Sequence, residues 1–106
     1  MNAEPGFDLH PGAAQDITEI WEFIAEDNPL AARRVRGDIL DAVRKLLAFP
    51  HQGHKRPDLT SRPLRFQTVR DYLVVYAPEE KPLVVIAVLH GRRSPRVIAA
   101  ILRGRE

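Results

Sequence analysis

The chain has 106 residues, of which 44% are hydrophobic and 28% charged, a size and composition typical of one folded domain rather than a disordered segment. It contains no cysteine, which excludes disulfide bonds and cysteine-ligated zinc. Its charge is segregated along the chain: residues 1–27 hold seven acidic and no Lys or Arg side chains, whereas residues 28–106 hold all 16 basic side chains against seven acidic ones. Thirteen of the 16 are arginine, whose guanidinium suits carboxylates and phosphates, so an acidic protein surface and a nucleic acid are both candidate partners.

The first half of the chain predicts a short strand followed by a helical hairpin. Phe7–Leu9 alternates apolar and polar side chains and is expected to form an edge strand. A helix is expected over residues 11–27 and a second over residues 29–49, because each begins with a proline and the residue before a proline disfavours helical geometry. Two apolar stripes at helical spacing predict their inner faces. These stripes are Ala13, Ile17, Ile20, Trp21 and Ile24 in the first helix, and Ala32, Val35, Ile39, Ala42, Val43 and Leu46 in the second.

The second half predicts a three-stranded antiparallel β-meander and a short C-terminal helix. A polar loop over residues 50–61 leads to three expected strands, Leu64–Thr68, Tyr72–Ala77 and Leu83–His90, joined by short turns. Ser94 and the proline after it are expected to start the last helix. The fold class is therefore α+β in a single domain over residues 1–106.

The two longest expected strands are apolar on both faces, over residues 72–77 and 83–89. One helical hairpin covers one face of a sheet, and the last helix is too short to cover the other. We therefore expect an exposed apolar face that a partner covers with a helix or a strand.

The strongest candidate for chemistry is the basic end of the last strand. Arg65 is expected to converge there with His90, Arg92 and Arg93 at one rim of the sheet. A histidine beside arginines is able to cleave RNA through attack of the 2′-hydroxyl, with histidine as general acid or base and arginine stabilising the phosphorane. The alternative is a rim that binds a target without chemistry, formed by Arg65, Arg92, Arg93 and Arg96.

No residue pattern predicts a metal or cofactor. His51 and His54 have the spacing of a ligand pair, but they lie in a polar loop with only Asp58 as a nearby carboxylate, so solvated histidines are the simpler interpretation. No apolar run has the length of a membrane span, and residues 1–6 lack the regions of a signal peptide. We expect a cytoplasmic protein.

The ordered set of motifs resembles the ParE/RelE toxin superfamily of bacterial type II toxin–antitoxin systems, over about residues 7–103. The matching segments are Leu9–Ala13, Asp16–Ile17, Ile20–Ala25, Ala31–Ala32, Ile39, Leu46, Pro50 with Gly53, Leu64–Arg65, Tyr72–Tyr76 and Val88–Arg93. The helix with Ile20-Trp21 and Ile24, and the ending Leu89-His90-Gly91, look like the ParE branch in particular.

The resemblance implies a toxin neutralised by an antitoxin of the ParD type, a ribbon-helix-helix protein that forms a hetero-oligomer with it. The C-terminal segment of the antitoxin would wrap the hairpin and the sheet. ParE-like members are associated with inhibition of DNA gyrase, and the toxin alone is not expected to bind specific DNA sequences. The residues expected to contact the antitoxin are Trp21, Ile24, Val35, Ile39, Tyr72, Val74 and Tyr76.

RelE-like members of the superfamily instead cleave messenger RNA in the ribosomal A site, with Lys, Arg and a C-terminal Tyr or His. This chain departs from that pattern, because no tyrosine follows Tyr76 and Lys55 is the sole lysine in the loop and strand before Tyr72. We therefore favour a toxin without catalytic residues that binds gyrase. The alternative is a ribosome-dependent endoribonuclease that uses Arg65, His90 and Arg92.

Overall fold

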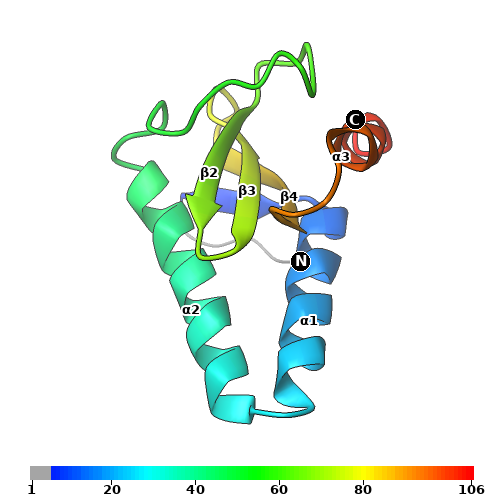
Figure 1. The fold of residues 1–106 in the computed structure, drawn as a ribbon. Helices are drawn as coiled ribbons and strands as arrows, with labels where there is room; N and C mark the ends of the chain where they lie inside the picture. The colour runs from blue at the N-terminus through cyan, green and yellow to red at the C-terminus, as the bar shows by residue number, and fades with distance from the viewer. Residues whose placement is uncertain (1–5) are drawn as a thin grey trace.

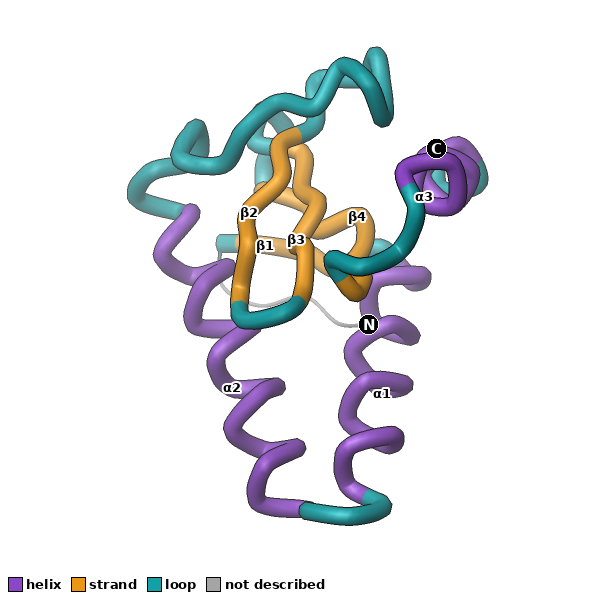
Figure 2. Tube along the Cα trace, viewed as in Figure 1, coloured by secondary structure: helices purple, strands orange, loops and turns teal. Residues whose placement is uncertain are grey.

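The computed structural model describes residues 6–106, so residues 1–5, part of the stretch examined for a signal peptide, lie outside the described residues. The elements follow the expected order (Figures 1 and 2). They are β1 (Phe7–Leu9), α1 (Pro11–Ala25), α2 (Pro29–Leu46), β2 (Arg65–Val69), β3 (Tyr72–Ala77), β4 (Leu83–His90) and α3 (Pro95–Arg103). The α+β prediction is confirmed, although α1 and α2 end a few residues earlier than expected.

Each helix begins with a side-chain cap followed by a proline. The caps are His10, Asn28 and Ser94, each accepting a hydrogen bond from a backbone N–H two or three residues later. The following proline fixes φ near its helical value and lacks the N–H that would otherwise stay unpaired at this position. The starts of the three helices are therefore set by local sequence.

The four strands form one mixed sheet in the order β1-β4-β3-β2. The meander β2-β3-β4 is antiparallel, as expected, whereas β1 is parallel to β4 and pairs with only Leu83, Val84 and Val85. Beyond Val85 no strand of the described chain continues along this side of β4. The edge of β4 from Ile86 to His90 consequently has no strand partner, and we call it the open edge. Side chains occupy part of it, because Asp16 accepts from the Val88 N–H and Arg105 donates to the Ile86 carbonyl.

Two apolar cores cover the two faces of the sheet. One lies under α1 and α2 and includes Ile39, Val74 and Tyr76. The other lies under α3 and the loop before β2, and includes Val75 and Leu89. The prediction that one apolar face of the sheet is exposed is therefore wrong.

The second face is covered because α3 and the loop act together. Ile98 and Leu102 of α3 are 3% and 1% exposed, and Leu59 and Leu64 of the loop are 5% and 2% exposed. These four side chains belong to the same apolar cluster as Leu89, which is 3% exposed. At roughly 25 cal/mol per Å² of buried apolar surface, this second core contributes directly to the stability of the isolated chain.

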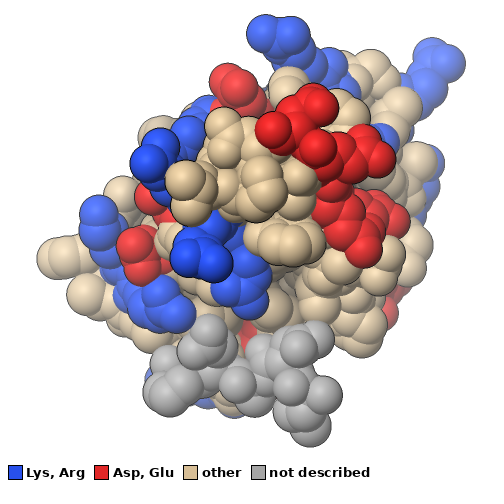
Figure 3. Space-filling model, turned by 90° about the horizontal axis from the view of Figure 1, so that it is seen from below, with Lys and Arg blue, Asp and Glu red and all other residues tan. Residues whose placement is uncertain are grey.

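The acidic and basic segments of the sequence also lie apart in the folded chain. The exposed side chains of α1 and its C-terminal cap include Glu19, Glu22 and Glu26, whereas those of α2 include Arg33 and Arg34. Viewed from below, acidic side chains gather on one side of this face and a group of basic ones lies on the other (Figure 3).

Candidate functional site

A groove of about 220 Å³ lies between α1 and the open edge of β4. The Val88 N–H points to this side of the strand, where it donates to Asp16 Oδ2 at 2.9 Å. Because backbone groups alternate along a strand, the N–H of His90 points to the same side. The groove is lined by Asp16, Glu19, Ile20, Phe23, Tyr72, Val88, Leu89, His90 and Arg93.

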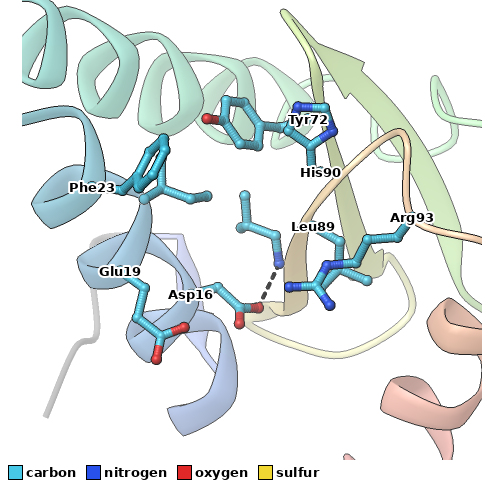
Figure 4. Close-up of a pocket in the computed structure, with 9 residues that line it drawn as sticks. Asp16, Glu19, Phe23, Tyr72, Leu89, His90 and Arg93 are labelled. Atoms are coloured by element: carbon cyan, nitrogen blue, oxygen red, sulfur yellow. Dashed lines mark hydrogen bonds between the residues drawn. The ribbon is translucent and has the colours of Figure 1, made fainter.

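The two walls of the groove have different chemistry. Figure 4 shows Glu19 and Phe23 on the α1 side and Tyr72, His90 and Arg93 on the sheet side. Phe23 is 77% exposed, the highest value among the large apolar residues of the described chain. The ring of Tyr72 packs edge-to-face against His90, with centroids 5.5 Å apart. The groove thus combines the exposed ring of Phe23, a strand edge without a strand partner, and charged side chains of both signs, Glu19 and Arg93.

The basic turn, defined here as Arg92, Arg93 and Arg96, continues from the end of β4 into the first turn of α3. All three side chains are exposed. His90 Nδ1 accepts a hydrogen bond from the Arg92 N–H at 3.1 Å, which orients the ring and directs Nε2 away from the turn. The predicted rim residues Arg92, Arg93 and Arg96 therefore share one short exposed segment, of which Arg93 lines the groove.

Arg65 does not join this rim. It pairs with Tyr76 at one end of β3, whereas His90 pairs with Tyr72 at the other end, four residues away. That separation is about 13 Å at the usual rise per strand residue. The Arg65 guanidinium instead donates to the carbonyls of His51 and Gly53, at 3.2 and 2.9 Å. The expectation that Arg65 converges with His90 is wrong, because the two residues sit at opposite ends of the strands.

Most side chains expected to contact an antitoxin lie inside the core. Ile39, Val74 and Tyr76 are fully buried and Val35 is 8% exposed, so these four pack the hydrophobic interior in this structure. The hydroxyl of Tyr76 donates to the Pro50 carbonyl at 2.7 Å and accepts from the Gly53 N–H at 2.9 Å.

The other members of that expected set lie on α1 and β3, and of these only Tyr72 lines the groove. Trp21, assigned to the apolar stripe of the first helix, is 40% exposed, and Ile24 and Tyr72 are half-buried. Phe23 was missed by the sequence analysis. A signal was available, because Phe23 falls off the stripe formed by Ile17, Ile20 and Ile24 and an apolar residue there is expected to face solvent.

Asp16 and Arg105 form an interaction that the sequence did not suggest. The two side chains are 11% and 18% exposed, and Arg105 Nη1 lies 2.6 Å from Asp16 Oδ2. The neighbouring His10 has its pKa lowered, first by burial and then by the positive charges of Arg105 and Arg62.

The loop histidines show no metal-site geometry. His51 lies 3.3 Å from Glu79 Oε1. Within residues 6–106 there is no group of three or more His, Cys, Asp or Glu side chains arranged to hold a metal ion. In the same part of the chain, no helix is long and apolar enough to cross a membrane.

Comparisons of sequence and structure with known proteins point to the same family. A family model described as the ParE toxin of the type II toxin–antitoxin system parDE matches residues 7–95. Toxin ParE2 of Mycobacterium tuberculosis, from strains CDC 1551 / Oshkosh and ATCC 25618 / H37Rv, is 26% identical over 106 residues, covering 92% of this chain and 91% of the relative. A solved structure titled as the chromosomal ParDE TA system from P. aeruginosa superposes with a TM-score of 0.64 at 20% identity, covering 79% of this chain and 92% of that chain. The chain belongs to the ParE toxin family of type II toxin–antitoxin systems.

Proposed function

We propose that this toxin inhibits DNA gyrase or a related topoisomerase by binding it through the basic turn. We further propose that a ParD-like ribbon-helix-helix antitoxin neutralises the toxin by occupying the groove, in a hetero-oligomer. This function places the chain in the cytoplasm, where gyrase and its DNA are found, and needs no cofactor and no covalent step.

The observation that carries the antitoxin proposal is the open edge of β4 in a chain whose two sheet faces are already covered. An extended peptide laid along this edge would gain backbone hydrogen bonds with groups such as the N–H of His90. Phe23 and Tyr72 offer apolar contact area at the same place, and aromatic side chains often dominate binding energy at interfaces.

The observation that supports target binding is the exposure of Arg92, Arg93 and Arg96 in one short turn. Guanidinium groups bind carboxylates and phosphates in a planar, bidentate manner. A gyrase–DNA complex presents both kinds of group. Binding alone would suffice to stall such an enzyme, so these arginines need no catalytic role.

The alternative ribonuclease uses Arg65, His90 and Arg92. It has less support because Arg65 lies at the far end of β3 and is bonded to two loop carbonyls. The exposed Glu19 carboxylate also lines the groove with His90, and its negative charge disfavours a phosphate at that position.

The test compares the purified wild-type chain with a variant in which Arg92, Arg93 and Arg96 are replaced by alanine. We expect the wild-type chain to inhibit supercoiling by gyrase and the variant to lose at least tenfold in potency. Arg33, Arg34 and Arg36, three exposed arginines of α2, are replaced by alanine in the control, which loses the same charge and should retain inhibition.

A second measurement follows messenger RNA after induction of the chain in growing cells. Intact messages together with inhibited supercoiling support the gyrase proposal. Cleaved messages with normal supercoiling would refute it in favour of the ribonuclease.

A further inference from the structure

Arg105, two residues beyond the end of α3, reaches back across the molecule to α1 and β4. Its Nη1 and Nη2 donate to Asp16 Oδ2 and Oδ1 at 2.6 and 2.9 Å, and Nη1 also lies 3.2 Å from the Ile86 carbonyl. The two side chains are largely shielded from water, at 18% and 11% exposure. A bidentate and shielded pair of this kind is stronger and more directional than an exposed ion pair.

The first turn of α1 is shaped to admit this guanidinium. A Cβ atom at Gly12 would lie 2.4 Å from Arg105 Nε, so any larger residue there requires the arginine to move. A second contact holds the same end of α3, because Arg62 Nη1 donates to the Leu102 carbonyl at 3.1 Å. The C-terminal end of α3 is therefore tied to parts of the chain far away in sequence.

Asp16 connects this tie to the groove. Its Oδ2 accepts from both Arg105 and the Val88 N–H, and Asp16 itself lines the groove. A backbone segment that pairs with the open edge of β4 takes over the Val88 N–H and displaces the carboxylate from it. Occupation of the groove and the full set of Asp16 contacts are thus mutually exclusive.

The basic turn spans the interval between the end of β4 and α3. One end is fixed by the pairing of His90 with Tyr72. The other is held by the docking of α3, which buries Ile98 and Leu102 and is tied down by Arg105 and Arg62. Within the turn, the Arg93 N–H also donates to the His90 carbonyl. Arg105 is therefore one of the contacts that set the position of Arg92, Arg93 and Arg96 relative to the groove.

We infer that Arg105 is a positioning residue. With Asp16 it forms a latch that holds α3 and the basic turn in place and that a segment bound in the groove would weaken. By thermodynamic linkage, loss of the latch in turn favours occupation of the groove. This role rests on the proposed function for its biological meaning, but the latch itself is measurable in the isolated chain.

The experiment is amide hydrogen exchange on the full chain with Arg105→Met, which keeps length and removes the ion pair. We expect the amides of Ile98 and Leu102, and that of Val88, to exchange at least tenfold faster than in the wild type. The α2 amide of Val43 should be unchanged. Arg103→Met removes an exposed arginine from the last turn of the same helix and is expected to change none of these rates.

Two further variants separate a latch from simple packing or misfolding. Arg105→Lys keeps a charge opposite Asp16 and should restore part of the protection that Arg105→Met loses. Gly12→Ala favours the helical state of α1 through its higher propensity but crowds Arg105, so it should speed exchange in α3 without speeding it in α1. Equal protection of α3 in Arg105→Met and the wild type, or equal effects of the Met substitutions at 103 and 105, would overturn the latch.

Supercoiling assays with the same variants test the link to function. Arg105→Met should lose potency against gyrase although the basic turn is intact in sequence, whereas Arg103→Met should not. Full potency in Arg105→Met, alongside fast exchange in α3, would overturn its positioning role. A wild-type chain that does not inhibit gyrase would refute the proposed target and leave the exchange data to decide the latch.

Discussion

Replacing Tyr76 with phenylalanine should lower the free energy of unfolding by more than the loss of one oxygen atom suggests. Tyr76 is fully buried, and its hydroxyl donates to the Pro50 carbonyl and accepts from the Gly53 N–H. These two bonds tie the start of the loop after α2 to the centre of the sheet. Removing the hydroxyl leaves a buried donor and a partly buried acceptor unpaired, at about 1–3 kcal/mol for the first and less for the second. We expect the free energy of unfolding to fall by about 2 kcal/mol.

Thermal unfolding followed by circular dichroism measures this loss. For a domain of this size, 1 kcal/mol corresponds to a shift in Tm of about 4–8 °C, so Tyr76→Phe should unfold roughly 10 °C lower. Tyr72→Phe is the matched control, since the structure gives its hydroxyl no hydrogen-bond partner within the described residues and it is half-buried. Its Tm should change by less than about 3 °C. Equal shifts in the two variants would refute the reasoning.

Three further predictions concern the groove, the loop and pH. Phe23→Ser should weaken binding of the cognate antitoxin at least tenfold in calorimetry while leaving Tm within about 2 °C, because the side chain is 77% exposed. Arg65→Ala should retain full inhibition of supercoiling, because Arg65 supports loop carbonyls away from the groove; a complete loss of inhibition with an unchanged fold would contradict this separation. His10 has its pKa lowered from 6.5 by burial, then by Arg105, so the unfolded chain takes up a proton first as pH falls. The stability contributed by neutral His10 is therefore full above pH 6.5 and is lost as the pH falls through the lower pKa of the folded chain, so His10→Asn should flatten the dependence of Tm on pH below 6.5.

The helices and the meander were predictable because their signals are local. Each helix start combines a capping side chain with a proline. Strands β3 and β4 are apolar runs, β2 mixes apolar and polar side chains, and short turns separate the three. The position of Arg65 was also within reach of the same logic. Arg65 begins β2 and the turn at Arg70 ends it, so an antiparallel partner places Arg65 at the end of the sheet opposite Tyr72 and His90.

Three features were not predictable from the sequence because they join distant segments: an ion pair, the cover of the second sheet face and the pairing of β1. Asp16 and Arg105 are separated by 89 residues, and neither is distinguished by its neighbours in sequence. The burial of the second sheet face depends on the path of the loop that carries Leu59 and Leu64, which no periodic pattern encodes. The pairing of β1 with β4 is similarly set by the crossover through the rest of the fold rather than by three residues.

The distribution of charge around the groove favours a peptide over a nucleic acid as its occupant. Asp16 and Glu19 line the α1 wall, opposite His90 and Arg93. A nucleic acid backbone carries a negative charge at every nucleotide and would meet the exposed Glu19 carboxylate along with the arginine. A peptide presents neutral backbone groups to the open strand edge and an apolar side chain to Phe23, and it avoids that repulsion. Arg93 both lines the groove and belongs to the basic turn, so a peptide seated in the groove would cover part of the proposed gyrase-binding surface, and neutralisation by the antitoxin would follow from direct occlusion.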